Sequence, residues 1–163
     1  MGARFALVTL ESFPIFIEDI YLLAPDGLIK DKWYRLATTS NLFRGLFRYF
    51  MKSPKLLLAL TSLLGSVGTL NKGLIKFVQI HLKHKSERMK VYYTWTLFRN
   101  LSVQPEIFLQ ILESHNIKAN LVLGEFDRVI NAQKFKKELK ESKNLKFKIV
   151  PLTHNKLFHY NFS

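Results

Sequence analysis

Short apolar runs that end at turn-forming residues predict three β-strands in this chain. The first covers residues 20–24 and stops at the sequence PDG, and its continuous apolar character indicates a strand buried on both faces. The second covers residues 119–123 and stops at Gly124. The third lies in residues 145–152, where an alternating pattern becomes wholly apolar.

Apolar residues at helical spacing predict helices before, between and after these strands. An apolar helix begins directly at the N-terminus and stops before Pro14, with no capping side chain ahead of it. Ser53, followed by Pro54, and Asn131 are the clearest helix starts further along. The other expected helical stretches are residues 31–52, 53–67, 71–101, 104–116, 131–142 and 153–160. Strand, helix, strand, helix at the C-terminal end is the order of parallel α/β units.

The composition allows a real hydrophobic core and excludes thiol chemistry. The 163 residues are 48% hydrophobic and 13% aromatic, which is enough for one domain. Cysteine is absent, so disulfides, thiolate metal sites and cysteine nucleophiles are excluded, and a reducing compartment such as the cytoplasm is expected. The most apolar stretch, residues 56–70, is about five residues short of a bilayer span.

A strong positive charge narrows the choice of partners. The net charge is +13 and the isoelectric point is near 10.0, which favours nucleic acid or an acidic membrane surface. The lysines of residues 134–148 are interleaved with Phe135 and Leu139 at helical spacing, as on a solvated helix face, and no nucleic-acid-binding motif accompanies them. We therefore expect no nucleic-acid partner and keep an anionic membrane surface open.

Two residues suited to proton transfer follow predicted strands. Asp127 follows the second strand and His154 follows the third. In a parallel sheet both loops lie at the same edge, so the carboxylate and the imidazole can meet in space. A carboxylate that accepts the proton of Nδ1 orients a histidine for general base catalysis. The alternative is that Asp127 caps a turn and His154 is an unrelated surface residue.

With these residues the chain resembles the α/β-hydrolase family. In that family a strand is followed by G-x-x-D, a helix, a further strand and a histidine that opens the last helix. The matching sequences here are LVLGEFDRVINAQKF and IVPLTHNKLF, with Gly124, Asp127 and His154 in the corresponding places. Thr153 departs from the pattern, since many members have glycine before the histidine.

The resemblance implies a fold and a division of the chain. The expected fold is α/β, a partial α/β-hydrolase fold of about three parallel strands with a large helical cap inserted. Residues 1–27 and 115–163 would form the hydrolase core, and residues 28–114 would form the cap. A sheet of three strands exposes the edge of its first strand, so we also expect self-association through that edge.

The resemblance also gives the first residues a meaning. The family's nucleophile lies in G-x-S-x-G, a tight turn between a strand and a helix. Met1 would follow that serine, with its backbone N–H as a vestigial oxyanion donor, and Gly2 would be the last glycine of the motif. The chain would then be the C-terminal part of a serine hydrolase for esters or related acyl compounds, with no cofactor and little activity alone. A ragged terminus is the alternative for this start.

A different class of function stays open beside this one. The chain can instead be a non-catalytic basic helical protein that binds an anionic membrane surface or a partner chain. Aromatic residues of the expected cap can line an acyl pocket or form the cap's own core. The sequence does not decide between a hydrolase and a binding protein, nor between these two roles of the aromatic residues.

The remaining candidate residues carry weaker signals. Asp26, after the first strand, is either an alternative acid or a turn former. His81 and His84 are spaced to share a metal ion, but no third ligand recurs near them, so we expect no metal site. No nucleophile-turn sequence surrounds the serines considered as substitutes, which are Ser12, Ser40, Ser53, Ser62 and Ser66.

Overall fold

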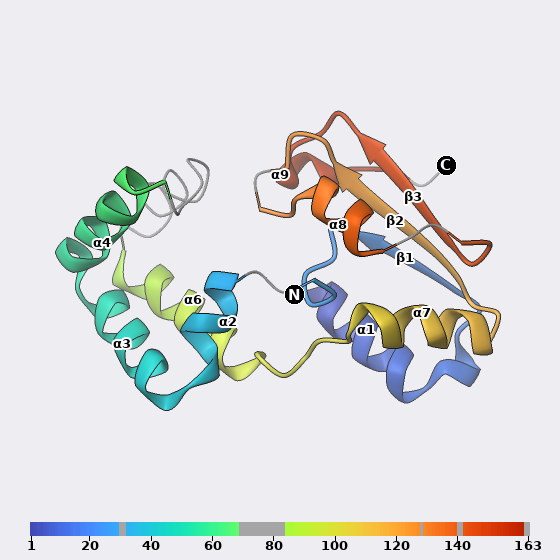
Figure 1. Cartoon of the computed structure of the whole chain (residues 1–163), viewed down its shortest axis with the longest axis horizontal. Coiled ribbons are helices and arrows are strands. Elements are labelled where there is room, and N and C mark those ends of the chain that lie inside the picture. The colour runs from blue at the N-terminus through green and yellow to red at the C-terminus, as the bar shows by residue number, and fades with distance from the viewer. Residues whose placement is uncertain (30–31, 69–83, 128, 140–141, 162–163) are drawn as a thin grey trace. The chain divides into compact units, whose positions relative to one another are not determined.

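The computed structural model describes residues 1–29, 32–68, 84–127, 129–139 and 142–161 (Figure 1). The chain divides into two compact units. The sheet unit comprises Met1–Lys30 and Leu101–Ser163, and the helical unit comprises Asp31–Asn100. Each unit has its own hydrophobic interior.

The sheet unit contains a parallel sheet of three strands. The strands are β1 (Asp19–Leu23), β2 (Lys118–Gly124) and β3 (Leu145–Val150), in the spatial order β1-β2-β3. Both pairings are parallel, with Leu22 beside Leu121 and Leu121 beside Phe147. The predicted strands and the α/β class are therefore confirmed.

Helices of the sheet unit cover one face of the sheet. They are α1 (Gly2–Ser12), α7 (Pro105–Ser114) and α8 (Ala132–Glu138), and a short 3-10 turn, Pro14–Phe16, joins α1 to β1. α1 and α7 lie side by side (Figure 1). Alternate strand residues and helix residues form one buried cluster, which includes Leu7, Leu10, Leu22, Phe108, Leu112, Leu121, Phe135 and Leu145.

The opposite face of the sheet is covered only near the carboxyl ends of the strands. There the helix α9 (His154–Leu157) contributes Leu157 to a small cluster with Ala24, Val122 and Val150. Further down the same face Tyr21 is 54% exposed. The expectation that the first strand is buried on both faces is wrong for β1, because no helix among the described residues covers that part of the sheet.

The boundary between the units differs from the predicted one. Residues 101–114, expected in the cap, belong to the sheet unit. The reason is α7, whose Phe108 and Leu112 are fully buried in the cluster that also holds Leu7 and Leu10 of α1. The inserted unit is correspondingly shorter, Asp31–Asn100.

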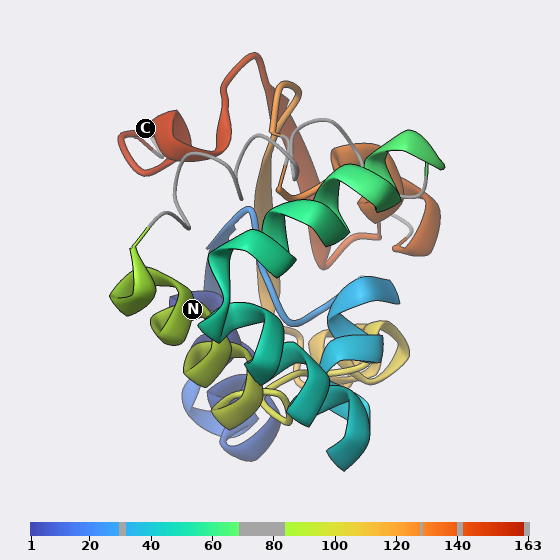
Figure 2. The same ribbon diagram turned by 90° about the vertical axis from the view of Figure 1, so that its left-hand side faces the viewer.

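The helical unit contains α2 (Lys32–Thr39), α3 (Asn41–Lys52), α4 (Pro54–Ser66) and α6 (Lys85–Leu97). The predicted helix over residues 31–52 is broken at Ser40, whose Oγ accepts a hydrogen bond of 3.2 Å from the N–H of Phe43 and so caps α3. α4 begins at Pro54 after Ser53, as predicted. Figures 1 and 2 both show α3 and α4 as neighbouring helices.

Aromatic side chains form the interior of the helical unit. Tyr34 packs edge-on against Trp95 with ring centroids 5.2 Å apart, and Phe47 lies 5.6 Å from Tyr92 and from Trp95. The buried Arg88 of α6 donates a hydrogen bond of 2.7 Å to the carbonyl of Met51 at the end of α3. Of the two roles considered for the cap aromatics, these four form core.

The sequence also raised the questions of a metal site at His81 and His84 and of a membrane-spanning segment. His81 lies outside the described residues, and His84 is the residue directly before α6, with no capping hydrogen bond from its side chain. Among the residues that the structure describes, no group of His, Asp or Glu is arranged to hold a metal ion. None of the described helices is long and apolar enough to cross a bilayer.

Candidate active site

The turn after β2 positions Asp127. β2 ends at Gly124, and the N–H of Asp127 donates a hydrogen bond of 3.2 Å back to the carbonyl of Gly124. Oδ1 of Asp127 accepts hydrogen bonds from the backbone N–H groups of Val129 (2.7 Å) and Ile130 (2.9 Å). This arrangement is an Asx turn, which leaves Oδ2 for another partner.

The loop after β3 brings His154 to the same place. The N–H of Glu125 bonds to the carbonyl of Val150 at 2.8 Å, and that of Phe126 bonds to the carbonyl of Leu152 at 3.2 Å. These bonds tie the two loops together across the carboxyl edge of the sheet. His154 is the first residue of α9, so its ring direction is set by a helix start that is anchored to β2.

Gly124 makes this close approach possible. A Cβ added at Gly124 would lie 2.5 Å from the carbonyl oxygen of Leu152 and 3.1 Å from Cβ of Asp127. Any side chain would therefore push the histidine loop away from the aspartate turn. Thr153 needs no such freedom, because its φ of −84° and ψ of 165° are ordinary extended values. The departure from glycine at that position is thus compatible with the loop.

Asp127 and His154 are in direct contact. Nδ1 of His154 lies 2.7 Å from Oδ2 of Asp127. Since an ionised carboxylate only accepts hydrogen bonds, Nδ1 is the protonated nitrogen and donates the bond, which assigns the tautomer by its partner. The side chain of Asp127 is fully buried and that of His154 is 29% exposed. The pairing predicted from strand position is therefore present.

The surroundings keep Asp127 ionised. Burial by itself would raise the pKa of Asp127, but the hydrogen bonds from His154, Ile130 and Val129, together with the charge of His154 when protonated, outweigh burial and hold the pKa below its ordinary value of 3.8. A carboxylate is consequently present beside the imidazole at neutral pH.

The other ring nitrogen of His154, Nε2, differs from Nδ1 in its surroundings. Within the described part of the chain, Nε2 has no hydrogen-bonding partner. The ring lies edge-on to Phe158 with centroids 5.7 Å apart. With Nδ1 protonated, Nε2 is the basic nitrogen, and it can take a proton from a nucleophile brought to it.

Met1 and Gly2 lie at the same edge of the sheet as this pair. Met1 caps α1 and Gly2 is its first residue. The first turn of α1 is held to the end of β1 by Arg4, which places the start of α1 at the carboxyl edge. A Cβ added at Gly2 would meet nothing within 4 Å, so in this chain no close packing requires the glycine.

Asp26, which the sequence left open as an alternative acid, pairs with Arg4. Both of its oxygens accept hydrogen bonds from Arg4, at 2.7 Å from Nε and 2.9 Å from Nη2. A bidentate ion pair of this kind commits Asp26 to Arg4 and leaves Asp127 as the acid beside His154. Arg4 was not among the residues predicted from the sequence, although its position three residues before the buried Leu7 marks it as facing the interior.

The serines of the sheet unit lie mainly at the other edge. Ser12 ends α1, Ser114 ends α7, and Ser142 precedes β3, so all three are at the amino ends of the strands. Ser40, Ser53, Ser62 and Ser66 belong to the helical unit. Among the described residues, no serine is hydrogen-bonded to His154.

Fold and site together define the class of protein. It is a parallel α/β protein in which a buried aspartate is hydrogen-bonded to a partly exposed histidine at the carboxyl edge of the sheet. In comparisons with known proteins, no family model matches this chain and no curated protein matches it.

Proposed function

We propose that Asp127 and His154 are the acid and base of a Ser-His-Asp triad, and that the chain is the C-terminal part of an esterase- or lipase-like hydrolase of the α/β-hydrolase class. The observation that carries this proposal is the 2.7 Å contact from Nδ1 of His154 to the buried, ionised carboxylate of Asp127. This contact leaves Nε2 as the nitrogen that can accept a proton from a nucleophile. The parallel sheet with both residues at its carboxyl edge supports it.

Each residue has a defined step in the proposed reaction. A serine attacks the acyl carbon of an ester while Nε2 of His154 takes its proton, and the imidazolium later gives that proton to the leaving alcohol. Asp127 holds the tautomer and stabilises the imidazolium. The Asx turn at Asp127 keeps Oδ2 aimed at Nδ1 throughout.

The nucleophile is part of the same proposal. It would be a serine directly before Met1, in the turn that leads into α1, with Met1 supplying a backbone N–H to the oxyanion and Gly2 completing the turn. The start of α1 at the carboxyl edge supports this placement. The chain by itself would then have little activity. A reducing compartment such as the cytoplasm is proposed, since the chain lacks cysteine. The proposed triad mechanism needs no cofactor.

The test is active-site labelling of the protein isolated from its native source. A fluorophosphonate probe reacts with activated serines, and mass spectrometry then shows whether the labelled polypeptide contains peptides of residues 118–156. In that native protein we expect His154→Ala to lower ester hydrolysis by about a thousandfold or more. The matched control is His159→Ala, an exposed histidine five positions further on, which should leave hydrolysis unchanged.

Two results would contradict the proposal. One is a native protein with these peptides that the probe does not label. The other is ester hydrolysis that survives His154→Ala at the level of the His159→Ala control.

A further inference from the structure

The positive charge of the chain is concentrated in the helical unit. Of the 25 Lys and Arg residues, thirteen lie within residues 31–100, together with only two of the 12 acidic residues, Asp31 and Glu87. The helical unit therefore carries eleven of the thirteen net positive charges, and the sheet unit is close to neutral. Such an asymmetry gives the helical unit a strongly positive potential.

α3 has a second apolar face in addition to the one it buries. Phe47 and Met51 face the interior of the helical unit. On the other side Leu42, Leu46 and Tyr49, spaced by four and three residues, are 77%, 46% and 59% exposed. Residues at this spacing lie in one stripe along a helix. The buried cluster that the described residues of the unit form on the first face does not include this stripe.

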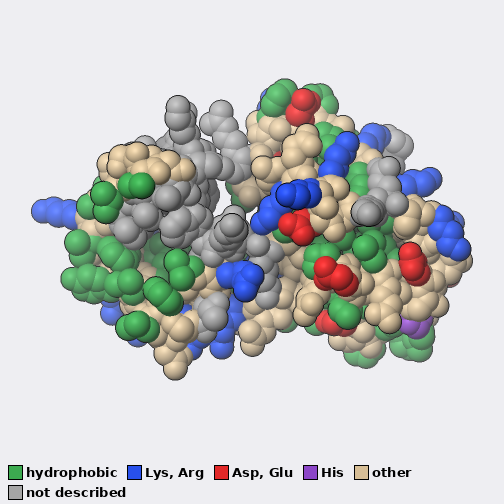
Figure 3. All heavy atoms as spheres, in the orientation of Figure 1, with side chains coloured by type: hydrophobic (Ala, Val, Ile, Leu, Met, Phe, Trp, Pro, Cys, Tyr) green, Lys and Arg blue, Asp and Glu red, His purple; other side chains and the backbone are tan. Residues whose placement is uncertain are grey.

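α4 carries a similar exposed stripe. Leu56, Leu63 and Val67, spaced by seven and four residues, are 37%, 62% and 67% exposed. α3 and α4 are neighbours, and hydrophobic side chains gather over this part of the unit in Figure 3. Together these residues form what we call the α3–α4 surface.

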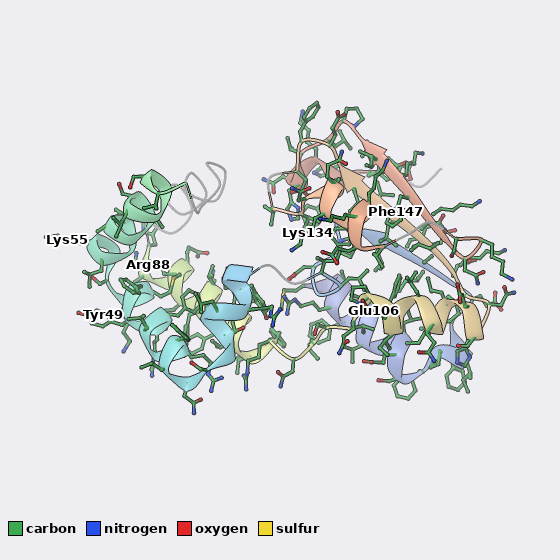
Figure 4. The ribbon with its side chains drawn as sticks, in the orientation of Figure 1. Tyr49, Lys55, Arg88, Glu106, Lys134 and Phe147 are labelled. Atoms are coloured by element: carbon green, nitrogen blue, oxygen red, sulfur yellow. The ribbon has the colours of Figure 1, made fainter. Side chains whose placement is uncertain are left out.

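Basic side chains accompany these stripes. Arg48 and Lys52 of α3 and Lys55 of α4 are all exposed. Figure 4 shows Tyr49 and Lys55 projecting from the same side of the unit. Long basic side chains beside an exposed apolar and aromatic stripe match the two layers of a membrane interface, the phosphate groups and the acyl chains below them.

We propose that the α3–α4 surface docks onto an anionic phospholipid bilayer. The apolar stripes lie at the boundary of headgroups and acyl chains, and Arg48, Lys52 and Lys55 bind lipid phosphates. A nucleic acid would use the charge but would leave the leucines of both stripes exposed to water, so lipid fits the surface better. The α3–α4 surface belongs to the helical unit, whereas Asp127 and His154 belong to the sheet unit. The inference stands or falls independently of the proposed hydrolase activity.

The test is vesicle flotation with the full chain. The vesicles are phosphatidylcholine alone or phosphatidylcholine with about one quarter phosphatidylserine. We expect binding to the anionic vesicles at about 0.1 M salt, with affinity at least about tenfold lower for neutral vesicles and a clear loss at about 0.5 M salt.

Two triple variants separate the apolar and the basic contributions. Replacing Leu42, Leu46 and Tyr49 with serine removes the α3 stripe, and replacing Arg48, Lys52 and Lys55 with glutamine removes the adjacent charge; each should weaken binding about tenfold or more. The matched controls make the same changes in the sheet unit, at Phe13, Ile15 and Phe16, and at Lys118, Lys136 and Lys137, which are all exposed. Circular dichroism and thermal melting of every variant check that it is folded.

Several outcomes would overturn the inference. Equal binding to neutral and anionic vesicles would remove the role of the basic side chains. Equal losses in the α3–α4 variants and in the sheet-unit controls would show that total composition, and no particular surface, governs binding. Binding to a short single-stranded DNA with none to vesicles would assign the charge to nucleic acid.

Discussion

Asp127 divides its two carboxylate oxygens between its own turn and His154. Oδ1 accepts hydrogen bonds from two backbone N–H groups of the turn, which hold the side chain independently of its contact with the histidine. Nδ1 of His154 lies 2.7 Å from the other oxygen, Oδ2. The sequence left two alternatives, an aspartate that caps a turn beside an unrelated histidine and an aspartate paired with His154. In the structure Asp127 both caps its turn and pairs with His154.

Asp127→Asn tests the charge of this residue. Because the folded-state pKa is lowered below 3.8, ionised Asp127 stabilises the fold fully above its unfolded pKa, and this contribution disappears as the pH falls through the folded value. We expect the variant to be less stable by about 1–3 kcal/mol at neutral pH. The difference from wild type should shrink as the pH drops from about 5 towards 2, measured by urea unfolding.

The exposed neighbour Glu125 provides the control for this experiment. Glu125→Gln removes one carboxylate from the same turn without touching His154, and should leave the pH dependence of stability close to that of wild type. A stability difference between wild type and Asp127→Asn that does not change with pH would contradict the role assigned to the carboxylate.

Gly124→Ala tests the close approach of the two loops. The added methyl would overlap the carbonyl of Leu152, so we expect a loss of about 1–3 kcal/mol in unfolding free energy and a weakened bond between His154 and Asp127. Proton NMR reports the latter through the downfield Nδ1–H signal. In the control Gly45→Ala, on α3, the added Cβ meets nothing within 4 Å, and helix propensity predicts a gain of about 0.5–1 kcal/mol.

At the scale of elements, one ion pair fixes the start of α1 to the end of β1. The side chain of Arg4 is only 3% exposed, whereas that of Asp26 is 44% exposed. Gly27 lies against Arg4 with a φ of +105°, and a Cβ there would be 2.7 Å from Cγ of Arg4. The turn after β1 is therefore shaped around the arginine, and it keeps the start of α1 at the edge where His154 lies.

Asp26→Asn measures this attachment. Removing the charge leaves a buried guanidinium with a weaker partner, and we expect a loss of about 1–2 kcal/mol, less than for a fully buried pair because Asp26 is half exposed. Glu87→Gln is the control, since Glu87 and Lys90 form an ion pair with side chains 46% and 71% exposed, worth less than about 0.5 kcal/mol. Similar effects of the two substitutions would contradict the structural role of Arg4 and Asp26.

At the scale of the molecule, the sheet presents an edge. β1 pairs with β2 on one side, and among the described residues no strand pairs with its other side. The carbonyl of Glu18 accepts a hydrogen bond from Lys118, and the N–H of Ala24 donates one to Val122. Since alternate residues of a strand bond to opposite sides, the N–H of Leu23 is directed towards the open edge. Exposed edges of this kind associate.

Leu23→Pro tests association through that edge. Proline removes the outward N–H without removing a bond to β2, so we expect the oligomeric species of the wild-type chain, measured by light scattering during gel filtration, to decrease. Leu23→Ala removes the same side chain but keeps the N–H, and it should associate as the wild type does. A monomeric wild-type chain, or equal behaviour of the two variants, would contradict edge-to-edge association.

What could be predicted from the sequence was local in origin. The apolar runs of β2 and β3, the cap at Asn131 and the break at Pro14 depend on neighbouring residues, and the structure has them as expected. The positions of Asp127 and His154 after strands also follow from local pattern, and the rule for parallel sheets then puts both at one edge.

Tertiary structure decided what depends on distant partners. Arg4 pairs with Asp26, and α7 joins the sheet unit through Phe108. Tyr21 is exposed because none of the described helices covers its part of the sheet. None of these features follows from residues nearby in the sequence. The concentration of charge in residues 31–100 likewise became visible only with the division into units. The sequence by itself determined where the strands lie and where Asp127 and His154 follow them, because the period of the side chains along a strand is a short-range property. Only the tertiary structure decided which surfaces pack together, because burial of apolar area depends on the whole fold.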